Sequence, residues 1–307
     1  MRNKDSLSRR SFLKSSVVAG TVGMMGGIPM LSSCSTDKSK KGELTLPKLL
    51  EQAPDGKVIK AGLIGCGGRG TGAAMDFLNA GPNLQIVALG DVFQDKLDSC
   101  REILKKERNV EIPDENCFLG FDSYEKVIDS GVDMVLLCTP PHFRPAHVEA
   151  AVNAQKHIFM EKPIAVDPFG VRKVLAAVKR AKTLNLNIVS GTIRRSQKDY
   201  METRRRVLNG EIGDIVGANI IRNGGALWFR TRKPEWTDME YMLRNWVNFC
   251  WLSGDHITEQ FIHEVDVMNW YLGKNPVKAT GWGGRQRRVT GDQYDFFSIE
   301  YLYDNGM

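Results

Sequence analysis

The chain has 307 residues and a formal net charge of +6, from 42 basic and 36 acidic side chains. Its 42% hydrophobic and 25% charged residues are globular averages, which exclude a disordered, collagen-like or coiled-coil chain, and its length suggests about two domains. Six cysteines without pairable spacing exclude a small disulfide scaffold. Residues 1–34 hold five basic side chains and one acidic one, so the remainder carries little excess charge and offers no footprint for nucleic acid.

The first residues have the order of parts that an export signal has. A basic segment ends in the pair Arg9-Arg10 followed by Phe-Leu-Lys, and the apolar, glycine-rich stretch at residues 16–31 is too short for a transmembrane helix. This pattern resembles a twin-arginine export signal. The alternative is a chance arginine pair in an N-terminal tail. We therefore expect a protein that is exported to the periplasm.

A cysteine closes this segment. The sequence Leu-Ser-Ser-Cys ending at Cys34 resembles a bacterial lipobox, in which Cys34 is cleaved and lipidated, and a polar run follows it. The alternative is ordinary signal cleavage beside an incidental cysteine. With the lipobox, residues 1–34 are a signal, residues 35–57 are a linker, and the lipid on Cys34 is the membrane contact.

A strand followed by a glycine-rich loop opens the globular part. Residues 58–64 form a short apolar run that predicts a buried strand, and the pattern G-x-G-x-x-G follows directly, ahead of a helical segment at residues 72–78. In this context the first glycine permits a tight turn, the second lets the backbone approach a pyrophosphate, and the third lets helix and strand pack closely. The candidate phosphate-binding residues are Gly65, Cys66, Gly67, Gly68, Arg69 and Gly70.

An acidic residue ends the next predicted strand. Residues 84–90 are apolar, and Asp91 follows at 21 positions beyond Gly70. A carboxylate at this spacing accepts hydrogen bonds from the adenosine ribose and repels a 2′-phosphate, so NAD is favoured over NADP. The alternative is an aspartate that caps a turn or a helix. Lys96 and Arg101 lie close enough in sequence to leave NADP open.

The alternation of strands and helices continues to residue 190. Strands are predicted at residues 132–138, 157–160 and 188–190, with helices at residues 145–154 and from Pro168, capped by Asp167, to Leu184. This order predicts a Rossmann domain with a doubly wound parallel sheet over residues 58–190. Because ligands bind beyond the carboxyl ends of such strands, further candidates for cofactor contacts are Thr139, Pro140, His142, Glu161 and Lys162.

Four stretches of the chain resemble one known family. They are the glycine loop, Thr139-Pro140-Pro141, residues 151–163 ending in Glu-Lys-Pro, and Gly-Asp-Ile at residues 213–215. In these the chain resembles the Gfo/Idh/MocA oxidoreductases, the family of glucose–fructose oxidoreductase and inositol dehydrogenase, over residues 58–307. The resemblance implies a second α/β domain at residues 191–307 with a large, mainly antiparallel sheet. It also implies a nicotinamide cofactor that meets a sugar or polyol between the domains.

The resemblance further implies a catalytic pair. Lys162 would lie beside the nicotinamide and the reacting hydroxyl, His263 would be the acid/base, and Glu259 would stand at the family's aspartate position. Hydride transfer from an alcohol needs a base for the proton and gains from a positive group near the oxygen, roles that histidine and lysine suit.

Acidic residues flank this histidine at helical spacing. Glu259 and Asp266 would share a helix face with His263, so both are catalytic candidates. The alternatives are a histidine capped by its acidic neighbours, a surface lysine at Lys162, and carboxylates paired with arginines. His256, Glu259 and His263 also have the spacing of a metal triad, but they lack the H-E-x-x-H order, and we expect no metal.

Aromatic and basic residues of the second half are weaker candidates. Trp228 and Trp236 flank a polar stretch and would line a pocket. Candidates to bind substrate hydroxyls are Arg194, Arg195, Arg244 and Asn245.

The C-terminus ends in a turn pattern. Residues 296–303 alternate as a strand, and Asp-Asn-Gly at residues 304–306 is typical of a hairpin turn, but the returning strand is absent. We therefore expect a truncated second domain, and a homo-oligomer through the C-terminal sheet in a full-length chain.

Two classes of function follow. The first is an exported NAD(P)-dependent oxidoreductase that transfers hydride between a sugar, glycoside or cyclitol hydroxyl and a tightly bound cofactor. A variant of it is a glycosidase that oxidises the sugar only transiently. The second is a noncatalytic lipoprotein that binds or senses carbohydrate. The pair Lys162 and His263 distinguishes an enzyme from a binding protein.

Overall fold

The computed structural model describes Thr45, Leu46 and residues 56–307. The expected export signal and Cys34 lie outside these residues. Within the described part, no helix is both long and apolar enough to cross a membrane.

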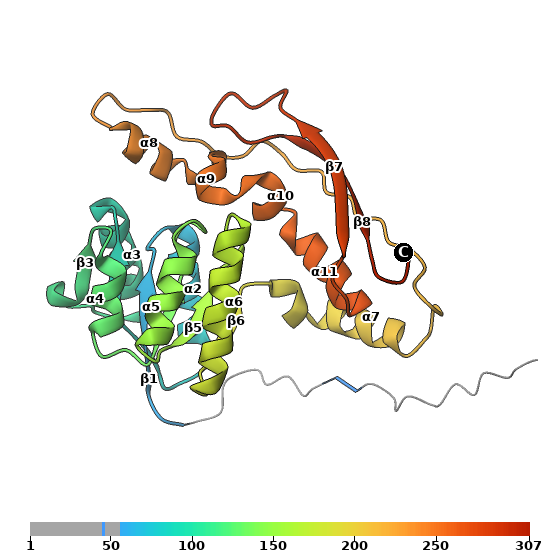
Figure 1. The fold of residues 1–307 in the computed structure, drawn as a ribbon. Helices are drawn as coiled ribbons and strands as arrows, with labels where there is room; N and C mark the ends of the chain where they lie inside the picture. Colours follow the sequence, from blue (N-terminus) through green and yellow to red (C-terminus); the bar gives the residue numbers. More distant parts are fainter. Residues whose placement is uncertain (1–44, 47–55) are drawn as a thin grey trace, which may run out of the picture. The chain divides into compact units, whose positions relative to one another are not determined.

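The first half of the described chain is a six-stranded parallel sheet (Figure 1). Its order reverses between β1 and β4, which is the switch point of a doubly wound sheet. The prediction of a parallel Rossmann sheet is therefore confirmed; the short strand β3 was not predicted. In sheet order the strands are β3 (Cys117–Leu119), β2 (Leu84–Asp91), β1 (Ile59–Ile64), β4 (Met134–Leu137), β5 (His157–Met160) and β6 (Ile188–Ser190).

Helices cover both faces of this sheet because successive strand residues point to opposite sides. In β4, Val135 and Leu137 belong to the core that includes α4, α5 and α6, whereas Leu136 belongs to the core that includes α2 and α3. The buried apolar side chains of the two cores hold the sheet between the helix layers. The helices are α2 (Gly68–Asn79), α3 (Gln94–Arg108), α4 (Ser123–Asp129), α5 (Arg144–Asn153) and α6 (Pro168–Thr183), with a 3-10 turn at Asp114–Asn116.

The first residues of two helices, α6 and α2, can be compared with the prediction. α6 begins as predicted, with Pro168 at its first position and the Asp167 side chain accepting a hydrogen bond from the Gly170 N–H at 2.7 Å. α2 begins four residues before the predicted segment, because the glycine loop itself supplies the first turn from Gly68, with Gly67 as the N-cap. The helix therefore presents its amino end inside the glycine motif.

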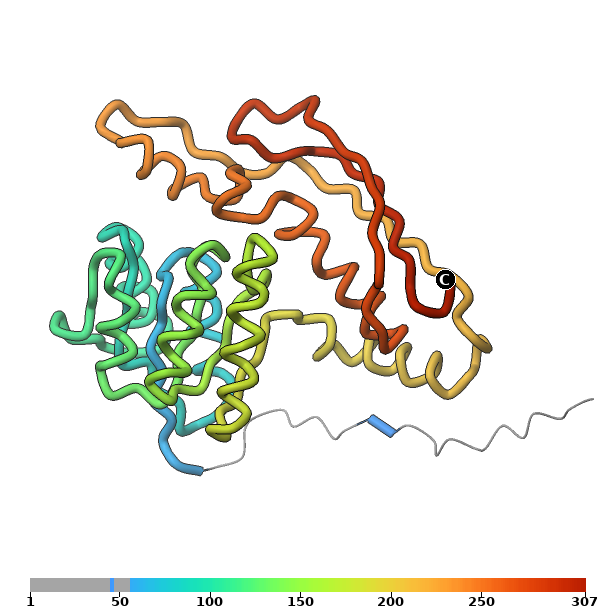
Figure 2. The backbone as a smooth tube through the Cα atoms, viewed as in Figure 1, coloured from blue at the N-terminus to red at the C-terminus, as the bar shows by residue number. Residues whose placement is uncertain are grey.

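The second half, from residue 191, combines short helices with long irregular segments, and a two-stranded antiparallel sheet closes it (Figure 2). The predicted strand at residues 296–303 is confirmed as β8, and it pairs with β7. The resemblance implied a large, mainly antiparallel sheet. In the described part of the second half, the sheet consists of these two strands. The elements are α7 (Lys198–Leu208), α8 (Asp238–Arg244), α9 (Cys250–Ser253), α10 (Asp255–Glu259), α11 (Ile262–Leu272), β7 (Lys278–Gly284) and β8 (Phe296–Leu302), with 3-10 turns at Ile193–Ser196 and Trp246–Asn248.

Candidate functional site

The glycine loop between β1 and α2 is shaped for an anionic group. Gly65 has a φ of +96°, and a Cβ on Gly70 would lie 1.7 Å from the Gly65 carbonyl oxygen, so both positions need glycine. A Cβ on Gly67 or Gly68 would meet nothing within 4 Å. The amino end of α2 has no side-chain cap and no acidic residue in its first turn. Free N–H groups beside open space fit the pyrophosphate of a dinucleotide.

A pocket of about 490 Å³ continues from this loop along the carboxyl ends of the strands. Most of the predicted cofactor residues line it. They are Gly65, Gly67, Gly68, Arg69, Gly70, Asp91, Thr139 and Pro140. Four predicted residues do not: Cys66, His142, Glu161 and Lys162 lie outside its lining.

Asp91 lies at the end of β2, as its predicted ribose-binding role requires. Its carboxylate accepts hydrogen bonds from the N–H of Cys66 at 2.7 Å and of Phe93 at 2.9 Å. Burial raises the pKa of Asp91, and these two bonds oppose that effect. A carboxylate has about four lone-pair sites, so Asp91 retains acceptors for ribose hydroxyls. Of the two cations that left NADP open, Lys96 lines the pocket, whereas Arg101 pairs with Asp114.

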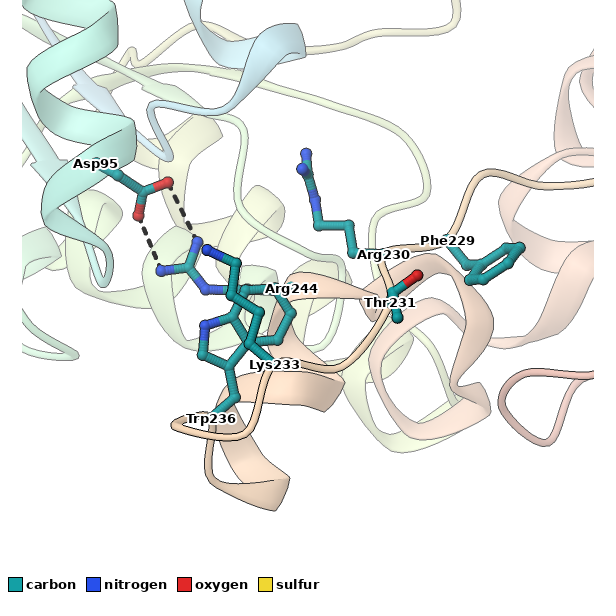
Figure 3. Close-up of a pocket in the computed structure, with 7 residues that line it drawn as sticks. All are labelled: Asp95, Phe229, Arg230, Thr231, Lys233, Trp236 and Arg244. Atoms are coloured by element: carbon teal, nitrogen blue, oxygen red, sulfur yellow. Dashed lines mark hydrogen bonds and ion pairs between the residues drawn. The ribbon is translucent and has the colours of Figure 1, made fainter.

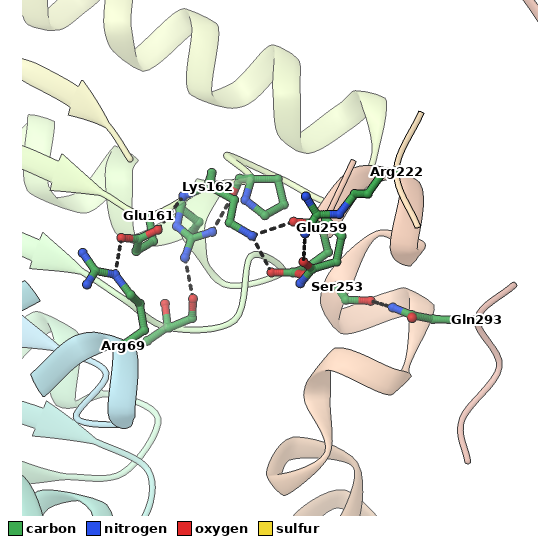
Figure 4. A network of polar contacts seen from close by, with 11 residues as sticks. Arg69, Glu161, Lys162, Arg222, Ser253, Glu259 and Gln293 are labelled. Atoms are coloured by element: carbon green, nitrogen blue, oxygen red, sulfur yellow. Dashed lines mark hydrogen bonds and ion pairs between the residues drawn. The ribbon is translucent and has the colours of Figure 1, made fainter. Parts of the chain in front are cut away.

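An ion pair connects the glycine loop to the Glu-Lys-Pro segment (Figure 4). Arg69 Nε donates to Glu161 Oε1 at 2.7 Å, and the other carboxylate oxygen of Glu161 accepts from the Lys162 N–H at 3.2 Å. Glu161 is buried, so its charge stays favourable only with such partners. Glu161 therefore fixes Lys162 relative to the phosphate-binding loop. The Lys162–Pro163 peptide bond is cis.

Arg144, at the start of α5, was missed from the sequence. Its side chain is 1% exposed, and its guanidinium donates to the carbonyl oxygens of Thr139, at 2.5 Å, and of Pro163. Burial lowers the pKa of Arg144 to about 10. Arg144 thus joins the two loops that hold the predicted site residues. The only sequence signal was an arginine ahead of the helix-starting Pro145.

The pocket contains a different histidine from the predicted one. His142 packs edge-on against Trp251, with ring centroids 5.1 Å apart, and lies outside the lining. His147 lines the pocket, stacks on Tyr124 at 4.2 Å and has Nδ1 3.3 Å from the Thr139 hydroxyl. Burial and the nearby Arg144 charge lower the pKa of His147 to about 3, so its ring is neutral.

Lys162 reaches across to the second half of the chain (Figure 4). Its Nζ lies 2.8 Å from Glu259 Oε1 and 2.6 Å from the Glu259 main-chain oxygen. The two side chains are only 15% and 6% exposed. Glu259 thus holds the Lys162 ammonium at the boundary between the halves.

His263 lies in the same electrostatic neighbourhood. It is half-buried, and its Nδ1 is buried without a hydrogen-bond partner in the described structure. Burial lowers the pKa of His263, and the positive charges of Lys162 and Arg194 lower it further. A neutral imidazole has a ring nitrogen that is able to accept a proton.

The helix that was expected to carry Glu259 and His263 on one face is interrupted. α10 ends at Glu259, and Phe261 caps α11, because the N–H groups of Gln260 and Phe261 both bond to the His256 carbonyl. The predicted contact between Glu259 and His263 is therefore replaced by the Lys162 pair. This break could not be seen in a sequence that lacks proline or glycine at that point.

The other charged candidates are held by partners. Asp266 accepts two hydrogen bonds from Arg195 Nε and one from its Nη2, at 2.8–3.1 Å. Arg194 pairs with Glu264 at 2.8 Å. Arg244 pairs with Asp95 on α3. In the described part of the chain, no group of three or more His, Cys, Asp or Glu side chains is arranged to hold a metal ion.

Comparison with known proteins bears on the first half most strongly. Residues 59–187 match the family GFO_IDH_MocA, described as an oxidoreductase family with an NAD-binding Rossmann fold. The matched residues include the glycine loop, Asp91 and Lys162. This segment is therefore an NAD-binding Rossmann fold.

The similarity to individual proteins extends further along the chain. An inositol 2-dehydrogenase of Salmonella typhimurium is 24% identical over 217 residues, 71% of this chain and 55% of that protein. A 2,7-anhydro-N-acetylneuraminate hydratase of Escherichia coli is 26% identical over 228 residues, 74% of this chain and 53% of that protein. The chain thus spans a little over half the length of these relatives.

A solved structure shows the same fold. The scyllo-inositol dehydrogenase of Lactobacillus casei with bound NAD(H) and scyllo-inositol matches with a TM-score of 0.59 and 21% identity, over 81% of this chain and 68% of that chain.

Proposed function

We propose that this chain is an NAD-dependent oxidoreductase acting on a sugar or cyclitol hydroxyl, because residues 59–187 match the NAD-binding Rossmann fold of the GFO_IDH_MocA oxidoreductase family. Relatives named as inositol dehydrogenases support this substrate class. The substrate would bind beside Lys162 and His263.

One observation carries the proposal. Lys162, which Glu161 fixes relative to the phosphate-binding loop, lies close enough to His263 for its charge to depress the pKa of that imidazole. The Nδ1 of His263 is buried and has no hydrogen-bond partner in the described structure, so no other residue holds its proton or its lone pair. A neutral base and a fixed cation at the same place are what oxidation of an alcohol requires.

The roles of the chain's own residues follow from this arrangement. His263 takes the proton of the substrate hydroxyl, and the Lys162 ammonium stabilises the negative charge that develops on the oxygen. NAD bound along the pocket supplies the acceptor for the hydride from the same carbon. Glu259 is a positioning residue that keeps Lys162 pointing at the substrate. In the reverse direction His263⁺ returns the proton.

We further propose export by the twin-arginine route and a lipid anchor at Cys34. Export of a folded protein allows NAD to be loaded before the membrane is crossed. Because free NAD is not replenished outside the cytoplasm, the cofactor would remain bound, reduced by one substrate and reoxidised by another.

A second candidate is a reaction without net oxidation. The relative named as a hydratase indicates that the same scaffold is associated with the addition or loss of water. In a glycosidase of this type, transient oxidation of the sugar would allow the aglycone to leave before the sugar is reduced again.

A substrate screen tests these proposals. Purified protein with NAD is mixed with cyclitols, aldoses and nitrophenyl glycosides, while the absorbance of reduced nicotinamide and of released nitrophenol is followed. Reduction of the cofactor by a cyclitol or aldose supports the oxidoreductase, and nitrophenol release without net reduction supports the second candidate. Binding of carbohydrate with neither product would overturn both and leave a binding protein.

A further inference from the structure

A segment of the second half closes one end of the cofactor pocket. The pocket lining near Asp91 includes side chains that lie far beyond the Rossmann domain in sequence. They are Trp228, Arg230, Leu243, Arg244 and Trp246. Since Asp91 marks the ribose position, these residues lie at the adenosine end, away from Lys162.

Arg244 fastens this segment to the Rossmann domain (Figure 3). Its guanidinium nitrogens lie 2.9 Å and 3.2 Å from the two carboxylate oxygens of Asp95, in the first turn of α3. The same guanidinium stacks over the ring of Phe93, with its carbon 3.9 Å from the centroid. Glu240, one turn earlier on α8, orients Arg244 by accepting a 2.8 Å hydrogen bond from its Nε. The Arg244 side chain is only 15% exposed.

The residues that face the pocket are also hydrogen-bonded to the residues that directly follow α8. Asn245 is fully buried, and its side-chain amide accepts from the Arg230 N–H at 2.6 Å and donates to the Arg230 carbonyl. Asn248 donates to the Trp228 carbonyl at 3.0 Å. The indoles of Trp228 and Trp246 meet edge to face, with centroids 6.5 Å apart. Residues 228–230 and 244–248 therefore form one connected unit rather than a loose loop.

We propose that residues 228–246 form a clasp over the adenosine end of the bound cofactor, and that the Arg244–Asp95 pair is its latch. This inference rests on the proposed cofactor role of the pocket. The rings of Trp228 and Trp246 offer faces and edges for a purine. The clasp must separate from α3 before the cofactor leaves. Arg244 is thus a cofactor-retention residue, remote from the reacting hydroxyl.

The rate of NADH release tests the clasp without reference to turnover. Protein loaded with NADH is mixed with excess NAD, and loss of the bound-NADH fluorescence is followed. A partly buried ion pair and a cation–π contact act together here, so R244A should release NADH about tenfold faster. D95A removes the ion pair but leaves the stacking on Phe93, so it should speed release by no more than R244A does, and the double variant should match R244A.

A matched variant controls for the loss of an arginine. Arg206 pairs with Glu202 on α7, and neither residue lines the pocket, so R206A should leave the release rate unchanged. Salt should speed release from the wild type and leave R244A little affected, because screening weakens the latch. Unchanged release in both R244A and D95A would overturn the clasp. Failure of the wild type to bind NADH would overturn the proposed function itself.

Discussion

Lys162 and Glu259, 97 positions apart in sequence, form a 2.8 Å ion pair that joins the Rossmann domain to the second half of the chain. Both side chains are largely buried, so neither charge has water as an alternative partner. The pair gives Lys162 a fixed direction and leaves His263 neutral beside it. The proposed chemistry depends on this relationship.

Loss of Glu259 should therefore affect both stability and turnover. Glu259→Gln leaves the Lys162 ammonium without a counter-charge, and we expect about 2–3 kcal/mol of destabilisation in urea unfolding, with a lower kcat. Lys162→Met combined with Glu259→Gln should cost less than the sum of the two single changes. The exposed pair of Lys173 and Glu149 is a control, and Lys173→Met should change stability by no more than about 0.5 kcal/mol. Additive costs at residues 162 and 259 would show that the pair contributes no coupling.

The pKa of His263 should respond to its charged neighbours in opposite directions. Lys162→Met removes a cation that lowers this pKa, so the pKa should rise. Glu264→Gln removes a carboxylate that raises it, so the pKa should fall. Imidazole proton resonances followed during a pH titration measure both shifts, even in inactive variants. Movement of both variants in the same direction would contradict the placement of His263.

Alanine substitutions at two glycines of the phosphate-binding loop should have different effects, one on NADH binding and the other on stability. An alanine at Gly67 has open space and an ordinary φ of −68°, so Gly67→Ala should fold normally but weaken NADH binding at least about tenfold, by occupying the pyrophosphate position. Gly70→Ala forces a Cβ into the Gly65 carbonyl and should destabilise the fold by about 1–3 kcal/mol or more. Thermal unfolding and NADH titration of each variant make the comparison. Normal affinity in Gly67→Ala would place the pyrophosphate elsewhere.

His147 should make the fold sensitive to acid. Its pKa is about 3 in the folded chain and about 6.5 when unfolded, so unfolding takes up a proton throughout the interval between them. Stability should fall as the pH drops below about 6.5, by up to about 1.4 kcal/mol per pH unit from this group. His147→Phe retains a ring against Tyr124 without the titration. Urea unfolding at neutral and mildly acidic pH should show a smaller acid loss in this variant; an equal loss would assign the effect to other groups.

The Rossmann sheet was readable from the sequence because its strands are continuous apolar runs that end at glycine, proline or acidic residues. The capped start of α6 at Asp167 was equally visible. α3 was not predicted, because only Leu97, Cys100 and Leu104 of its 15 residues are buried and the rest is polar. Its buried residues follow helical spacing, but they are too few to outweigh that polarity.

Only part of the candidate site could be predicted from the sequence. Local patterns located the glycine loop, Asp91 and the Glu-Lys-Pro segment, and the family resemblance singled out His263. The partners of these groups could not be predicted, because an ion pair such as Lys162–Glu259 depends on how the two halves pack. The burial of Arg144 and the end of α10 at Glu259 are likewise tertiary effects that leave no local sequence pattern.

The most direct test compares the rate of hydride transfer in single-turnover mixing of the protein, NAD and the substrate that the screen identifies. The wild type and Lys173→Met should form reduced nicotinamide at the same rate, whereas His263→Ala and Lys162→Met should each be slower by about 10²-fold or more, the contribution of a positioned base or cation. Wild-type rates in both His263→Ala and Lys162→Met would contradict the assignment of this site.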